Sequence, residues 1–154
     1  MRPLRVTESQ IGETLTHLRA AGRSRCECVV LWLGRDQGDF VLVDRVYRPE
    51  QVAYSDLFRI EPHSMDAILE ILGSDGLMIA AQVHSHPREA FHSRADDQWA
   101  IVRHVDALSL VVPDFALRTD SRSFLDHMKA YQLTPANRWH ELSAIEARQW
   151  LEVR

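Results

Sequence analysis

Apolar and polar positions alternate along the chain with two periods, one typical of helices and one typical of strands. Residues 6–22 carry apolar side chains at helical spacing, with Thr7 and Gln10 placed as a capping box and a glycine at the end. The β-rich runs 26–34 and 39–47 follow, separated by the turn-like segment RDQGD. This pattern predicts one helix and then two neighbouring antiparallel strands.

The rest of the chain continues the alternation of helices and strands. The expected elements are a helix at 63–73, a strand at 77–86, a helix at about 94–104, a strand at 108–113, a helix at 124–130, a strand near 138–142 and a last helix with a capping box at Ser143 and Glu146. No repeat, linker or low-complexity segment interrupts this order. We therefore expect one α/β domain that spans residues 1–154.

Composition narrows the class of protein. A chain of 154 residues can bury roughly 70% of its unfolded surface, so it needs neither a disulfide nor a metal merely to fold. A net charge of -4 argues against nucleic-acid binding, and no apolar run approaches the ~18 residues of a membrane span. Cys26 and Cys28 are too close in sequence for an unstrained bridge, and nothing upstream resembles a signal peptide. The expected location is the cytoplasm, with no nucleic-acid or membrane partner.

The stretch VHSHPREAFHSRADD, residues 83–97, concentrates candidate metal ligands. Side chains alternate between the two faces of a strand, so His84 and His86 point to the same side, within reach of one ion. Two imidazoles on one face suit zinc (Zn2+). The alternative for an isolated H-x-H pattern is a pair of solvated or core histidines. A proline that ends the strand, a loop and then a helix with acidic residues in its first turn favour the zinc site.

The third ligand of this site is expected from Asp96 or Asp97. Ser93 is a good helix N-cap, and Asp96 shares its face three residues later, so both side chains can face the histidines. Asp97 lies about 100° further round the helix axis. The alternative for either acid is a favourable interaction with the helix dipole and nothing more.

Two histidines and one carboxylate leave a zinc coordination position open for water, which is typical of a catalytic site. Hydrolysis also needs a group that carries a proton, and Glu27 is the candidate. It opens a strand whose next six residues are all apolar, so a carboxylate there is costly unless it is paired or functional. The alternative is an exposed strand end. Cys26 and Cys28, which flank it, are interpreted as small buried hydrophobic residues rather than ligands.

These residues together resemble the motif of the JAMM (MPN, JAB) zinc metallopeptidases. Glu27 is followed by HSHP at 84–87 and by S-x-x-D at 93–96, in the order that this family uses. The resemblance covers about residues 26–113. It implies the fold of the family, a cytidine-deaminase-like α/β sandwich with a mixed, mainly antiparallel sheet flanked by helices. It also implies that the histidines bind zinc, that Glu27 is the general acid/base and that Ser93 donates to the tetrahedral oxyanion.

The chain departs from the family pattern in two places. The family aspartate usually lies eleven residues after the second histidine and the serine eight after it, and these positions hold Asp97 and Arg94. Counting by S-x-x-D instead selects Asp96, keeps Ser93 and requires a loop that is one residue shorter. Loops tolerate deletions better than helix faces tolerate rotation, so we favour Asp96. The second departure is Val30, which replaces the glycine of E-x-x-G.

The resemblance implies an isopeptidase that cleaves after the C-terminal glycine of a ubiquitin-like protein, in deconjugation or precursor maturation. The short format resembles bacterial members found beside ubiquitin-like, E1-like and E2-like proteins in anti-phage operons. Alternatives are a peptidase for small substrates or sulfur carriers and a metal-free scaffold of the same family. A zinc nucleobase deaminase would need H-x-E and P-C-x-x-C, which the chain lacks. His92 is interpreted as an exposed loop histidine, with the orientation of substrate as its alternative role.

Overall fold

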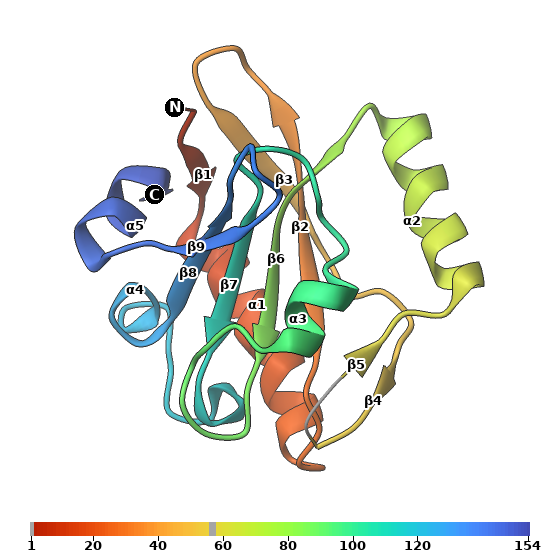
Figure 1. Ribbon diagram of the computed structural model, residues 1–154, viewed down its shortest axis with the longest axis vertical. Coiled ribbons are helices and arrows are strands. Elements are labelled where there is room, and N and C mark those ends of the chain that lie inside the picture. Colours follow the sequence, from red (N-terminus) through yellow and green to blue (C-terminus); the bar gives the residue numbers. More distant parts are fainter. Residues whose placement is uncertain (1, 56–57) are drawn as a thin grey trace.

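The computed structural model describes residues 2–55 and 58–154, which form a curled, mixed β-sheet flanked by helices (Figure 1). The sheet has the strand order β10-β1-β3-β2-β6-β7-β8-β9. Its strands are β1 (Leu4–Val6), β2 (Val29–Asp36), β3 (Val41–Tyr47), β6 (Met78–Ser85), β7 (Leu108–Val112), β8 (Lys129–Leu133), β9 (Trp139–Glu141) and β10 (Leu151–Val153). The two short strands β4 (Val52–Ala53) and β5 (Phe58–Arg59) pair separately.

Helices cover both faces of the sheet. They are α1 (Glu8–Gly22), α2 (Pro62–Asp75), α3 (Arg94–Trp99), α4 (Phe124–His127) and α5 (Ala144–Trp150), with a short 3-10 turn η1 (Asp114–Ala116). In Figure 1, α1 lies across one face, while α2 and α3 lie on the other. None of the helices in the described ranges has the length and apolar character that a bilayer crossing requires.

Strand β2 is the centre of the core, because its apolar residues alternate between the two layers. Val30 and Trp32 pack in the cluster that contains α1, whereas Leu31 and Leu33 pack with Ile68 of α2. All of these side chains are fully buried. Full burial of each apolar side chain contributes about 1.5–3 kcal/mol, so the continuous apolar run in the sequence specifies a strand covered on both faces.

Strand register brings distant parts of the sequence to one end of the sheet. β2 is antiparallel to β6, and Val29 at the start of β2 pairs with His84 near the end of β6. β7 is parallel to β6, so Val112 at the end of β7 pairs with Ser85. The Val112 carbonyl also accepts the His86 N–H. The beginning of β2 and the ends of β6 and β7 therefore meet at the same edge.

Helix α1 and the β2–β3 pair confirm the expectations for the first part of the chain. The Thr7–Gln10 capping box is present, and β2 and β3 are antiparallel neighbours. The Ser143–Glu146 capping box also starts α5 as expected. One boundary differs, because β2 begins at Val29 rather than at residue 26. Glu27 therefore precedes the strand instead of opening it.

Several other boundaries differ because tertiary contacts compete with the local pattern. α2 continues past Gly73 and ends at Asp75, followed by Gly76, whose φ of 62° suits a glycine C-cap. α3 ends at Trp99 rather than near residue 104. The reason is that the side-chain oxygen of Gln82 in β6 accepts the N–H of Ile101 and Val102, which a longer helix would bond internally.

Five strands of the described residues were not expected from the sequence, namely β1, β4, β5, β8 and β10. β8 occupies Lys129–Leu133, where the sequence suggested the end of a helix, because this segment pairs with both β7 and β9. β1 and β10 are three residues each and pair in parallel with one another. Strands this short carry little periodicity, and their stability comes from partners at the other end of the chain.

A close helix contact links the core to the residues after the H-x-H motif. Gly22 of α1 lies against Phe115 of η1, and a Cβ added to Gly22 would lie 2.5 Å from the Phe115 Cβ. Phe115 has a φ of 52°, and its N–H donates to the carbonyl oxygen of His86 over 2.7 Å. This left-handed turn is costly for a phenylalanine, so it depends on its neighbours.

Gly22→Ala should lower the free energy of unfolding by about 1–3 kcal/mol, because the added methyl group overpacks this contact. Gly12→Ala in the same helix has nothing within 4 Å of the new Cβ. It should raise the free energy of unfolding by roughly 0.5–1 kcal/mol through lower chain entropy. Urea denaturation of the two variants measures both effects. Equal stability of the Gly22 variant and the natural protein would show that η1 does not pack against α1 in this way.

Candidate metal centre

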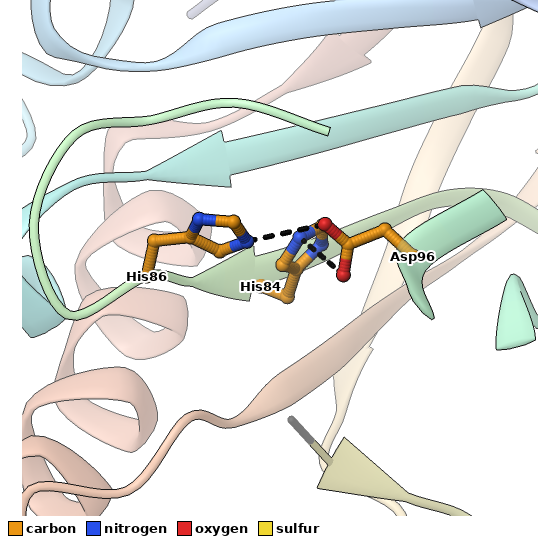
Figure 2. A group of neighbouring side chains, drawn as sticks. All are labelled: His84, His86 and Asp96. Carbon is orange, nitrogen blue, oxygen red and sulfur yellow. Dashed lines mark hydrogen bonds and ion pairs between the residues drawn. The ribbon is translucent and has the colours of Figure 1, made fainter. Parts of the chain in front are cut away.

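His84, His86 and Asp96 form a compact buried group where β2 begins and β6 ends (Figure 2). Their exposed fractions are 0%, 3% and 5%, and one candidate ligand atom from each lies within 4.8 Å of the others. Asp96 Oδ1 is 3.3 Å from His84 Nε2, and Asp96 Oδ2 is 3.1 Å from His86 Nε2. The two imidazoles and the carboxylate converge on one point.

The N-terminal cap of α3 holds the carboxylate in this position. Ser93 is the N-cap, and its hydroxyl oxygen accepts the Asp96 N–H over 3.1 Å. In return, Asp96 Oδ2 accepts the Ser93 N–H over 2.7 Å. This capping box uses one carboxylate both to start the helix and to face the histidines.

The polar atoms of this group fit a metal ion. His84 Nε2 lies within ion-pair distance of Asp96 but lacks hydrogen-bond geometry, and it has no hydrogen-bond partner among the described residues. Such buried atoms are rare in proteins unless something else binds them. Two imidazole nitrogens and a carboxylate oxygen are a ligand set that zinc prefers when its fourth position is open.

Electrostatics keeps the carboxylate in its ligand form. Burial acts to raise the pKa of Asp96, but its contacts with His84 and His86 and the Ser93 N–H outweigh this and hold the pKa well below its ordinary value. Asp96 is therefore ionised at neutral pH, as metal binding requires. The Nδ1 atoms of both histidines have no hydrogen-bond partner within the described part of the chain. Neither ring is oriented through its second nitrogen, so packing and α3 must fix the site.

Asp97 points away from this group, although it is adjacent in sequence. Its Oδ1 lies 2.7 Å from His92 Nδ1, and its side chain is 57% exposed. Consecutive helical residues differ in direction by about 100°, so only one of the two aspartates can face the histidines. The structure brings Asp96 to them. It also gives Asp97 a specific partner, where the sequence suggested only the helix dipole.

His92 is not the exposed loop histidine that the sequence suggested. Only 4% of its side chain is exposed. Its ring packs against Tyr131 and Trp139, with centroid separations of 5.0 and 5.1 Å. These aromatic residues lie in β8 and β9, and β8 was not expected from the sequence, so the burial of His92 could not be foreseen.

Glu27 and Ser93 line a cleft of about 210 Å³ beside the candidate metal centre. Glu27 is only 2% exposed, which excludes its alternative as an exposed strand end. Its Oε1 is 3.9 Å from His86 Nε2. Its N–H donates to the Tyr54 carbonyl, which fixes the backbone beside β4. The other lining residues are His86, Pro87, Arg88, Glu89 and Phe91.

Comparison with known proteins agrees with this geometry. No family model matches the chain. The probable metalloprotease y4jG of Sinorhizobium fredii is 30% identical over 153 residues, which cover 96% of this chain and 93% of that protein. The chain belongs to this metalloprotease family. The solution structure of protein DSY2949 from Desulfitobacterium hafniense is 21% identical, with a TM-score of 0.67 over 98% of this chain and 92% of that one, and it shows the same fold. The His84, His86 and Asp96 group of the present chain also fits the JAMM motif.

Asp96→Asn should abolish the metal-dependent rise in melting temperature, because a neutral amide is a poor ligand. Added zinc at a hundred times its Kd stabilises a single-site protein by about 2.7 kcal/mol, or roughly 5–10 °C for this size. Asp97→Asn is the matched control, since the amide oxygen can still accept from His92 and the rise should remain. Thermal unfolding with zinc and with a chelator measures the difference. Loss of the rise in the Asp97 variant alone would make Asp97 the ligand.

Proposed function

We propose that this metalloprotease relative is a zinc-dependent isopeptidase or peptidase that cleaves after the C-terminal glycine of a ubiquitin-like protein. The observation that carries the proposal is the buried convergence of His84, His86 and Asp96 beside a cleft that contains a second carboxylate. A metal ion held by these three residues supplies the Lewis acidity that makes water a nucleophile at neutral pH. The remaining steps belong to residues of the chain.

Glu27 is proposed as the general acid/base. It lies in the cleft, next to His86, and a buried carboxylate of this kind can take a proton from water and deliver it to the leaving amine. The position of the carboxylate follows from strand register, because the start of β2 adjoins the end of β6. Glu27 and the two candidate histidine ligands therefore lie at neighbouring strand ends of the same sheet.

Ser93 is proposed as the donor to the oxyanion of the tetrahedral intermediate. Its oxygen accepts the Asp96 N–H, so its own hydrogen can still donate, and Ser93 lines the cleft. A hydroxyl that is fixed by a helix cap is preorganised for a charge that develops only during the reaction.

The substrate class is proposed from the shape of the cleft and from the resemblance to the JAMM family. A cleft of about 210 Å³ is small, and it suits an extended chain of glycines better than bulky side chains. Half-exposed Phe91 at its border offers an apolar surface to such a chain. On the resemblance alone, we extend the proposal to a cytoplasmic role with E1-like and E2-like partners in anti-phage defence.

Protein purified without added metal should contain one zinc ion per chain, because two imidazoles and a carboxylate favour zinc among the available metals. Elemental analysis by mass spectrometry measures this directly. Stoichiometric iron or manganese in place of zinc, or hydrolysis by metal-free protein, would contradict the assignment.

Glu27→Gln should keep zinc and the fold but lose about 10²–10⁴-fold in turnover, because the amide has the same shape and cannot carry a proton. The assay is cleavage of a Gly-Gly-Lys isopeptide on a ubiquitin-like protein, with zinc content measured on the same sample. Exposed Glu70→Gln on α2 is the matched control and should cleave at the natural rate. Retention of more than about a tenth of the turnover by the Glu27 variant would remove Glu27 from the mechanism.

A further inference from the structure

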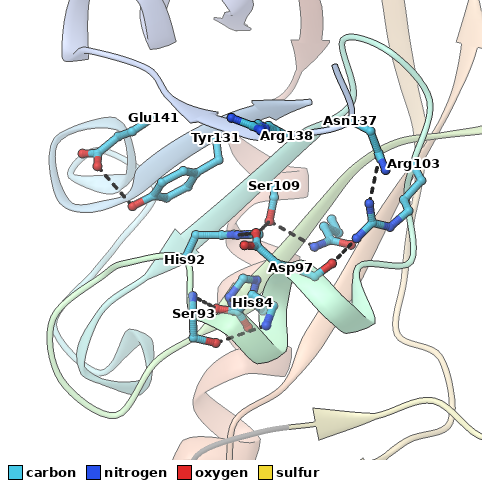
Figure 3. Close-up of polar contacts among 12 residues, drawn as sticks. His84, His92, Ser93, Asp97, Arg103, Ser109, Tyr131, Asn137, Arg138 and Glu141 are labelled. Carbon is cyan, nitrogen blue, oxygen red and sulfur yellow. Dashed lines mark hydrogen bonds and ion pairs between the residues drawn. The ribbon is translucent and has the colours of Figure 1, made fainter. Parts of the chain in front are cut away.

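A chain of hydrogen bonds runs from α3 through His92 into the sheet (Figure 3). His92 Nδ1 is 2.7 Å from Asp97 Oδ1, and His92 Nε2 is 3.2 Å from the hydroxyl of Ser109 in β7. The Ser109 oxygen is 3.0 Å from the amide nitrogen of Gln82 in β6. The Gln82 oxygen accepts the N–H of Ile101 over 2.9 Å. The chain therefore connects the first turn of α3 to the segment that follows its last turn.

The direction of each bond in this chain is fixed by its two ends. The backbone N–H groups after α3 can only donate, so the Gln82 oxygen faces them and its nitrogen donates to Ser109. The Ser109 hydroxyl then donates to His92 Nε2, and His92 Nδ1 donates to the Asp97 carboxylate, which can only accept. Burial lowers the pKa of His92, in agreement with a neutral ring. Every donor in the chain has an acceptor.

The position of His92 makes this chain rigid and places it beside the metal centre. Its ring is enclosed by Tyr131 and Trp139, and its centroid is 6.1 Å from that of His84. α3 has only six residues, which is too short for a helix to be stable by itself. The rotation of this helix decides whether Asp96 or Asp97 faces the histidines. A fixed anchor for Asp97 therefore also fixes Asp96.

We propose that His92 is a positioning residue, which holds α3 in the rotation that directs Asp96 at His84 and His86. The Asp97–His92–Ser109–Gln82 chain replaces the hydrogen bonds that the two ligand histidines lack at their Nδ1 atoms. The two adjacent aspartates thus have different functions, because Asp96 faces the metal centre and Asp97 anchors the helix. The effect on metal affinity rests on the proposed metal site, whereas the effect on α3 does not.

The test uses His92→Leu, which keeps an apolar side chain between the aromatic rings but removes both bonds. Ser109→Ala removes the link between His92 and Gln82 in this series of hydrogen bonds. It replaces the first variant as the test if His92→Leu folds poorly. Asp97→Asn is the conservative variant, because its amide oxygen can still accept from His92. Thr14→Val is the control for stability alone, since it removes the buried 2.8 Å bond from Trp32 Nε1 to Thr14 Oγ1 on the other face of the sheet.

The measurements are zinc Kd by chelator competition, kcat and KM, and hydrogen exchange of backbone amides in metal-free protein. His92→Leu and Ser109→Ala should raise the zinc Kd by about tenfold or more, as loss of outer-shell support typically does. They should lower kcat at zinc concentrations near the Kd of the natural protein with little change in KM, and they should speed exchange in α3 but not in α1. Asp97→Asn should remain near the natural protein. Thr14→Val should lower the melting temperature and leave the zinc Kd unchanged.

Two results would overturn the proposal. One is natural zinc affinity and natural exchange rates of α3 in both His92→Leu and Ser109→Ala. The other is an equal rise in zinc Kd for Thr14→Val, which would make the effect a general loss of stability. If the natural protein binds no zinc, the proposed function fails, and the exchange rates of α3 in the metal-free variants alone decide the role of His92.

Discussion

The ionised carboxylate of Asp96, 5% exposed between two buried imidazoles, is a charge that the protein has to compensate internally. An isolated buried carboxylate would cost several kcal/mol, so its surroundings are arranged around it. The Ser93 N–H compensates it from the cap of α3, and His86 compensates it from the end of β6. A bound cation would complete this compensation. The buried charge that makes the site costly without metal therefore also favours the binding of a cation.

The sheet contributes the second half of the site through its register. Antiparallel pairing of β2 with β6 places the segment before Val29 beside the histidines, so Glu27 reaches the cleft from a distant part of the sequence. Parallel pairing of β6 with β7 fixes the chain at His86, whose N–H donates to the Val112 carbonyl, and the Phe115 N–H of η1 donates to the His86 carbonyl. Ligands and proposed acid/base are thus attached to strands, and only Asp96 and Ser93 depend on a short helix.

That helix also explains how two adjacent aspartates face different partners. The chain keeps the S-x-x-D face, with Ser93 as cap and Asp96 toward the histidines, and the following acid is turned to His92. The sequence of the helix alone does not decide this, because a rotation of about 100° would present Asp97 instead. The two arrangements are distinguished by His92, which contacts Asp97 and packs against aromatic residues of β8 and β9.

The sequence by itself determined the long elements and the composition of the site. Helix α1, the β2–β3 pair and the cap at Ser93 follow from local periodicity and capping, which act between neighbours in the chain. The H-S-H-P and S-x-x-D segments identified the candidate ligands, but two adjacent aspartates satisfy the same local rules. Only the tertiary structure decided which aspartate faces the histidines. Tertiary contacts also bury the side chain of His92, end α3 at Trp99 and form the strands β1, β8 and β10. Each of these depends on a partner far away in sequence, such as Gln82 for the end of α3, and local pattern carries no information about such partners.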